Sequence, residues 1–165
     1  MTRLKLNPEY AKRHLFVTLL MIGLGCWFGY DGFVRYPSVS AHDLYVSIEK
    51  SEPAAECDLE AFKAQKIKTQ YGFTFFAFLA SAVVGLRLLK SRNFAFEFDD
   101  TGFTCGGIRA SYADITSVDE SQWDKKGILI IAVSGRKIAL DVWHHVGVKD
   151  FYKKLKSPVD TDGKI

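Results

Sequence analysis

Two long uncharged apolar runs lie in the first half of the chain, at residues 15–30 and 71–86. With their flanks they define candidate helices over residues 15–34 and 71–90. Each is long enough to cross about 30 Å of hydrocarbon at about 1.5 Å per residue. The few charged residues in these segments lie near the ends, where long side chains reach the headgroups. A soluble core in so short a chain could hardly enclose two such helices, so the sequence predicts a two-helix transmembrane hairpin.

The charges beside the runs indicate which way this hairpin faces. Residues 1–14 carry four bases against one acid, and three further bases accompany the end of the second run. Residues 31–70, between the runs, carry seven acids and five bases. Because Lys and Arg concentrate on cytoplasmic flanks, we expect an integral, multi-pass protein of the cell (inner) membrane. Both termini, including an N-terminal segment over residues 1–14, are expected in the cytoplasm.

A cleaved signal peptide is the alternative for the first run. Its basic flank and the tripeptide Val39-Ser40-Ala41 fit that reading. However, the run exceeds the usual apolar length of about 7–15 residues, and the tripeptide lies well beyond it. A retained helix is therefore favoured, and whether the run is cleaved stays open.

The segment between the runs, residues 35–70, is predicted to be an exoplasmic helical elbow. Pro37 should end the first helix. Residues 59–70 contain strong helix formers and no Pro or Gly, so the second helix should begin near Asp58 as its N-cap. The three cysteines are scattered without a CxxC pair, which favours three unpaired thiols over an intermolecular bridge through Cys57.

After Arg92 the apolar pattern changes to a period of two. Phe94, Phe96 and Phe98 alternate with smaller or polar residues, which is typical of a half-buried strand. Apolar stretches bounded by turn residues predict five more short strands. These lie around Phe103 and over residues 108–112, 115–118, 128–133 and 136–142, with a two-residue hairpin turn at Ser134-Gly135.

The chain closes with apolar residues at helical spacing over residues 148–155. We therefore expect an α+β fold, in which the transmembrane hairpin is followed by a small antiparallel β-barrel or sandwich. This domain should cover residues 93–156 and be capped by the C-terminal helix. The polar tail at residues 157–165 is predicted to be disordered.

Three phrases of this domain carry a resemblance to known proteins. They are FEFDDTGF at residues 96–103, SYADITSVD at 111–119 and QWDKKGILII at 122–131. With the two spans before them and the final helix, they resemble small bacterial membrane proteins that carry a pleckstrin-homology-like (PH-like) domain. The resemblance covers residues 93–156 and the two-span layout. It implies a membrane-associated binding or scaffold module and brings no catalytic residues with it.

No pattern in the chain indicates catalysis. Asp99 and Asp100 fall in a turn composition, and His144-His145 has no third ligand at metal spacing. Nucleophile elbows, glycine-rich phosphate loops and paired-carboxylate motifs are missing from the sequence. We predict a protein that is not an enzyme, with no catalytic, cofactor-binding or metal-binding residues and no cofactor. The small net charge of +3, without a basic stripe, argues against nucleic-acid binding.

The phrase Trp123-Asp124-Lys125-Lys126-Gly127 is the most distinctive candidate for binding. Lys125 and Lys126 could face anionic lipid headgroups or an acidic partner, with Trp123 as an apolar anchor. Arg109 and Lys137 could extend this basic surface. The alternative is a loop whose Trp123 packs on the rim of the domain while the lysines are only solvated.

These patterns predict a membrane-anchored, PH-like binding or scaffold module displayed at the cytoplasmic face. Its partner stays open among a protein, a second copy of the chain and anionic lipid headgroups. The alternative is an accessory subunit of a larger membrane protein complex. In that case small residues such as Gly23, Gly25, Ala77 and Gly85 would permit close helix packing.

Overall fold

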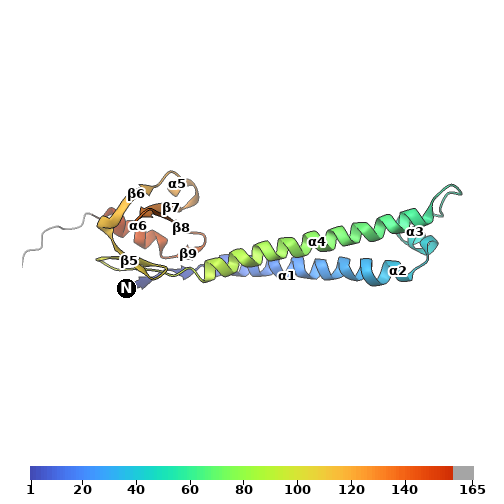
Figure 1. Ribbon diagram of the computed structural model, residues 1–165, viewed down its shortest axis with the longest axis horizontal. Coiled ribbons are helices and arrows are strands. Elements are labelled where there is room, and N and C mark those ends of the chain that lie inside the picture. The colour runs from blue at the N-terminus through green and yellow to red at the C-terminus, as the bar shows by residue number, and fades with distance from the viewer. Residues whose placement is uncertain (158–165) are drawn as a thin grey trace, which may run out of the picture. The chain divides into compact units, whose positions relative to one another are not determined.

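The computed structural model describes residues 1–157, and the predicted disordered tail lies outside them except for Ser157. The chain divides into two compact units (Figure 1). The helical unit consists of His14–Arg87. The β unit combines Met1–Arg13 with the chain from Leu88 onward.

Helices make up the whole of the regular structure in the helical unit. They are α1 (Pro8–Tyr30), the π-helical turn η1 (Asp31–Arg35), α2 (Tyr36–Ser38), α3 (Ala41–Glu49) and α4 (Leu59–Arg92), with α1 and α4 each continuing into the β unit. Two continuous helical stretches, Pro8–Ser38 and α4, are long and apolar enough to cross a membrane.

Both helical stretches extend beyond the predicted spans 15–34 and 71–90, and the ends predicted near Pro37 and at Asp58 agree with the structure to within one residue. The first helical stretch ends at Ser38, one residue after Pro37, where Val39 turns extended. The Asp58 carboxylate accepts a hydrogen bond of 3.0 Å from the backbone N–H of Ala61, as an N-cap does.

Small residues form the seam along which α1 and α4 pack. A Cβ atom at Gly25 would lie 3.0 Å from the ring of Phe78, and one at Gly32 would lie 3.0 Å from Gln70 and Tyr71. Side chains of α4 therefore pack directly against the backbone at these two glycines, and small residues that permit such close packing are typical of membrane helix interfaces. The buried residues of the seam are Gly25, Gly32, Ala77 and Ser81.

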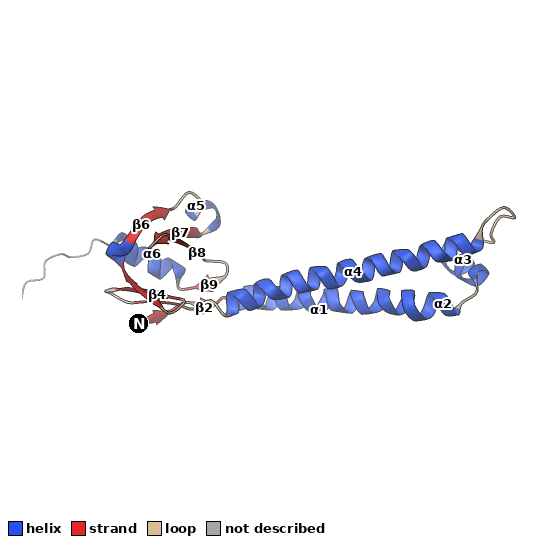
Figure 2. Cartoon of the chain, viewed as in Figure 1, coloured by secondary structure: helices blue, strands red, loops and turns tan. Residues whose placement is uncertain are grey.

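The β unit contains three antiparallel sheets (Figure 2). The first sheet has the strand order β1 (Thr2–Arg3), β3 (Phe96–Phe98), β4 (Gly102–Cys105), β5 (Ile108–Ser111). The second sheet pairs β2 (Lys5–Leu6) with β9 (His145–Val146). The third sheet has the order β6 (Ile115–Asp119), β7 (Ile128–Val133), β8 (Arg136–Asp141). The short helices are η2 (Tyr112–Asp114), α5 (Trp123–Lys126) and α6 (Val148–Lys156).

The six predicted strands and the final helix are confirmed, and so is the hairpin turn. Ser134 and Gly135 both have positive φ, at 48° and 75°, as the tight turn between β7 and β8 requires. Of the predicted barrel or sandwich, the barrel is wrong, because the strands of the described residues form open sheets rather than a closed barrel. Between β5 and β6 the capping box of Ser111 and Asp114 starts η2, and the two strands belong to different sheets.

Aromatic side chains make up the centre of the β-unit core. The Phe151 ring of α6 lies 5.0 Å from that of Phe96, 5.4 Å from Phe98 and 5.8 Å from Phe103, measured between ring centroids. All four side chains are buried. The amphipathic helix α6 therefore covers the first sheet with the apolar face that its sequence spacing predicts.

The N-terminal residues complete this fold. In β1, Arg3 pairs with Glu97 of β3, and β2 pairs with β9. Between these strands Leu4 is 3% exposed and its N–H donates to the carbonyl of Phe96 at 2.9 Å. No pattern in the sequence predicts these strands. The segment before the first apolar run is thus built into the domain that follows the second.

Residues 141–146, here called the clasp segment, hold the ends of both long helices within the β unit. The Asn7 N–H donates to the carbonyl of His144 at 2.8 Å, and the ring of His144 lies 4.5 Å from that of Tyr10. On the other side, Nε2 of the buried His145 lies 3.0 Å from the carbonyl oxygen of Ser91 near the end of α4. Because a carbonyl only accepts, this Nε2 is the donor.

Candidate functional site

A pocket of about 740 Å³ opens in the β unit between α5, the clasp segment and α6. Lysines and large aromatic side chains dominate its lining. The lining residues are Asn7, Trp123, Asp124, Lys126, Gly127, Val142, Trp143, Lys149, Tyr152 and Lys153. The pocket is the strongest candidate for a functional site in the described part of the chain.

The one-turn helix α5 positions the first wall of the pocket. It ends at Gly127, whose φ of 68° is a left-handed conformation that glycine adopts without strain. The Gly127 N–H donates to the carbonyl of Trp123 at 2.8 Å, and the Gly127 carbonyl accepts from Val142 at 3.1 Å. A side chain here would also crowd Val142, at 3.1 Å from the added Cβ. Glycine thus lets α5 turn directly into β7 beside the clasp segment.

Trp123 forms the base of this wall by packing on α6. Its ring lies 4.2 Å from that of Tyr152, centroid to centroid. The Tyr152 hydroxyl donates to Glu120 at 3.2 Å, and Lys156 pairs with the same carboxylate at 2.7 Å. The hydrogen bond from Lys156 holds the pKa of Glu120 below its ordinary value of 4.5. Burial, with Glu120 beside the hydroxyl, raises the pKa of Tyr152.

Positive charge dominates around the pocket. Its lining has three lysines, Lys126, Lys149 and Lys153, against one acid, Asp124. Within residues 1–157, none of the three lysines forms an ion pair. By contrast, the other two lysines near the end of α6 are paired, Lys154 with Asp100 and Lys156 with Glu120. The three pocket lysines are therefore available to an anion.

Trp143 of the clasp segment forms the opposite rim. It is 43% exposed, and its ring lies 5.2 Å from the Arg13 guanidinium and 6.5 Å from the Tyr10 ring. Asn7, which precedes α1 by one residue, also lines the pocket. This rim is consequently built on the chain just before the first apolar run.

The structure separates the five residues singled out from the sequence. Trp123 and Lys126 line the pocket, whereas Lys125, the neighbour of Lys126 on α5, does not. Arg109 lies in β5 of the first sheet and Lys137 in β8 of the third. Both are exposed, and neither lines the pocket.

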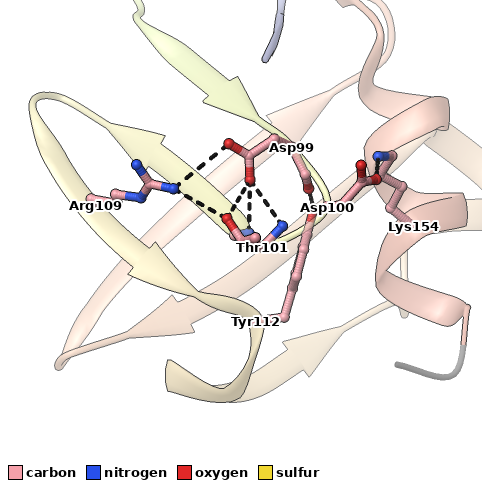
Figure 3. A network of polar contacts seen from close by, with 7 residues as sticks. Asp99, Asp100, Thr101, Arg109, Tyr112 and Lys154 are labelled. Atoms are coloured by element: carbon pink, nitrogen blue, oxygen red, sulfur yellow. Dashed lines mark hydrogen bonds and ion pairs between the residues drawn. The ribbon is translucent and has the colours of Figure 1, made fainter. Parts of the chain in front are cut away.

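Arg109 belongs to a separate polar network at the turn between β3 and β4 (Figure 3). Its guanidinium donates to the Thr101 hydroxyl at 3.1 Å and lies 3.7 Å from the Asp99 carboxylate. One Asp99 oxygen also accepts from the Thr101 N–H at 2.9 Å and from the Thr101 hydroxyl at 2.7 Å. These bonds hold the pKa of Asp99 below its ordinary value of 3.8. Arg109 thus stabilises a turn.

Asp100 points away from Asp99 and pairs with Lys154 of α6 (Figure 3). The two neighbouring carboxylates therefore do not form an acid–base couple, as their turn composition predicts. Among residues 1–157, His, Cys, Asp and Glu side chains form no cluster of three that could hold a metal ion.

The sequence carries a signal for two of the pocket lysines. Lys149 and Lys153 are four residues apart, so both lie on one face of the final helix. No sequence pattern predicts that Trp143 and Asn7 line the pocket, because the contacts of the clasp segment and the N-terminal strands place them there. Comparisons with protein families, curated proteins and solved structures found no match.

Proposed function

We propose that this protein is a two-span integral membrane protein that displays a non-catalytic, PH-like binding or scaffold domain at the cytoplasmic face of the cell membrane. The β unit is the displayed domain, and its pocket is the binding site. The helical unit is the anchor.

The surface of the helical unit supports the anchor role. Large apolar side chains such as Phe16 and Phe75 are more than half exposed along α1 and α4. Contiguous apolar surface on this scale is costly in water and normally marks contact with a membrane or a partner. Both helices also meet the length and hydropathy expected of a span.

One observation carries the proposed topology: β1 and β2 pair with β3 and β9. Residues before the first span and residues after the second span therefore fold as one unit. A single folded unit lies on one side of a membrane, so the chain must cross an even number of times. Cleavage after Ala41 would remove Leu4 from the core, which argues for retention of the first helix. The basic flanks then favour the cytoplasm.

The order of elements supports the PH-like assignment. Consecutive antiparallel strands are followed by one amphipathic helix whose Val148 and Phe151 enter the core. A pocket with aromatic walls and unpaired lysines is suited to binding a ligand, and such binding requires no catalytic group. A binding or scaffold role is therefore easier to support than turnover.

Thiol labelling tests the topology. In a C26S/C105S variant, Cys57 between the spans should react with a membrane-impermeant maleimide in intact cells. A matched variant, C26S/C57S/C105S/S117C, places one exposed cysteine on β6 and should react only after the membrane is permeabilised. The reverse pattern would refute the cytoplasmic placement.

The second candidate function is an accessory subunit of a larger membrane complex. The structure uses Gly25 within the helical seam, but a Cβ at Gly23 would meet no atom within 4 Å. Gly23 therefore offers an open position for another helix. Stoichiometric co-purification of other membrane subunits from gently solubilised membranes would favour this candidate over a free-standing module.

A further inference from the structure

We propose that the pocket of the β unit binds the phosphate group of an anionic phospholipid from the membrane that holds the two helices. This assignment rests on the proposed membrane anchor, and it names the ligand of that same site. Three steps lead to it: the charge of the pocket, the aromatic walls, and the place of the pocket along the chain.

The charge fits a phosphate. Lys126, Lys149 and Lys153 come from two elements and line one pocket without an ion pair of their own. A phosphate oxygen accepts charge-assisted hydrogen bonds from such ammonium groups. The single acid in the lining, Asp124, leaves a positive excess, which disfavours a cationic ligand.

The aromatic walls fit a lipid better than a free anion. Trp123 is fixed against Tyr152, while Trp143 keeps nearly half of its surface exposed at the rim. Trp and Tyr side chains favour the boundary between headgroups and hydrocarbon, because their rings are apolar and carry one polar group. A small soluble anion would not need these apolar contacts.

The rim of the pocket contacts the chain just before the first apolar run. The Trp143 ring lies 5.2 Å from the Arg13 guanidinium, and the first apolar run starts at Leu15. Two residues span at most about 7 Å, and the headgroup layer on each side of a bilayer is about 5–8 Å thick. With this run as the first span of the proposed anchor, Arg13 falls in the headgroup layer, and Trp143 of the rim contacts Arg13.

Native mass spectrometry of the full-length protein in detergent micelles tests the assignment by counting bound lipids and titrating them. Phosphatidylglycerol is the anionic probe and phosphatidylcholine the zwitterionic control. The pocket variant K126Q/K149Q/K153Q is compared with K5Q/K125Q/K137Q, which removes the same charge from exposed, unpaired lysines outside the pocket.

We expect phosphatidylglycerol to bind the wild-type chain more tightly than phosphatidylcholine. The pocket variant should raise its apparent Kd at least about tenfold, since three charge-assisted contacts are lost. The control variant should change it less than about twofold. Equal losses in both variants, or no preference for the anionic lipid, would overturn the proposal. If the triple variant does not fold, K126Q against K125Q repeats the comparison between adjacent residues.

A soluble probe separates the two sources of phosphate. Glycerol phosphate that binds as tightly as phosphatidylglycerol would make this a soluble-anion site and overturn the lipid assignment. Failure of the anchor is distinguishable from failure of the pocket. Reversed Cys57 labelling with intact lipid preference would refute only the topology, while correct labelling without preference would refute only the pocket assignment.

Discussion

The two units of this chain place their large apolar side chains in opposite ways. In the β unit, Phe96, Phe98 and Phe151 are at most 1% exposed. In the helical unit, Phe16 and Phe75 are 67% and 62% exposed. The first unit removes its apolar surface from water by folding, whereas the second turns that surface outward. This difference supports the proposed anchor role of the helical unit, whose exposed apolar side chains would face the hydrocarbon of a membrane.

Contacts inside the two units differ in the same sense. The β unit fills its core with rings from distant strands and from α6, and it draws on the N-terminal residues to do so. The helical unit instead packs side chains of α4 against the backbone at Gly25 and Gly32 and leaves many large apolar side chains exposed. Substitutions of one residue type in each unit should therefore have opposite consequences.

The largest expected difference is between two phenylalanines. Phe151→Ala should lower the free energy of unfolding by about 3–5 kcal/mol, because it opens a cavity in the aromatic core. Phe75→Ala, on an exposed face of α4, should change it by less than about 1 kcal/mol. Thermal unfolding of the full chain in micelles, followed by near-UV circular dichroism, measures both. Similar losses would break the comparison.

Leucines give the next largest contrast. Leu4→Ala should destabilise the β unit by about 2–4 kcal/mol, since Leu4 is buried in its core although it lies 92 residues before Phe96, where β3 begins. Leu19→Ala, at an exposed position of α1, should leave the β unit unchanged. Denaturant unfolding of both variants checks this. A stable L4A variant would show that the N-terminal strands are dispensable.

Glycines sharpen the comparison within the helical unit. Gly32→Ala should weaken the helix seam by about 1–3 kcal/mol, because its Cβ would lie 3.0 Å from the Cβ of Gln70. Gly23→Ala meets no atom within 4 Å and should be neutral or slightly stabilising through helix propensity. Unfolding of the helices by SDS in mixed micelles measures the change in unfolding free energy for both variants. Equal changes in the two variants would argue against this seam.

The smallest expected effect concerns pH and is confined to the β unit. The pKa of Asp99 is below 3.8 when folded, mainly through its hydrogen bond with Thr101. A carboxyl group whose pKa is lowered by folding stabilises the folded state at pH values above its unfolded pKa. This stabilisation is lost as the pH falls through the folded pKa. Asp99→Asn should therefore lower Tm at pH 7 and flatten its fall at acidic pH. An unchanged acid profile in the Asp99→Asn variant would contradict this account.

Sequence patterns sufficed where structure is local. The alternation of Phe94, Phe96 and Phe98, the positive-φ turn at Ser134-Gly135 and the cap at Asp58 each depend on a few adjacent residues, and all three regions formed as predicted. Sequence patterns did not predict strands whose pairing partners lie far away in the chain. Strands of two residues, such as β1 and β2, are too short to show a period, and their partners lie 90 or more residues away in the chain.

The residues of the candidate site likewise fall into those predicted by local sequence and those placed by long-range contacts. Trp123 and Lys126 were found because they stand in one distinctive phrase. Lys137 and Arg109 were grouped with them by charge alone, but sheet order puts each in a different place. Trp143 joins the pocket through contacts of the clasp segment with α1, which no local pattern encodes.

The pairing of β1 with β3 is the central claim, and a disulfide between Arg3→Cys and Glu97→Cys tests it most directly. Since Leu4 and Phe96 share a ladder hydrogen bond, the adjacent pair Arg3 and Glu97 is the close, non-hydrogen-bonded kind that a disulfide can bridge. In a background with the native cysteines replaced by serine, we predict that mild oxidation of the full-length protein joins this pair. The control pair R3C/T104C, two strands apart, should stay reduced. Equal cross-linking in both, or none in R3C/E97C, would contradict a domain completed by its own N-terminus.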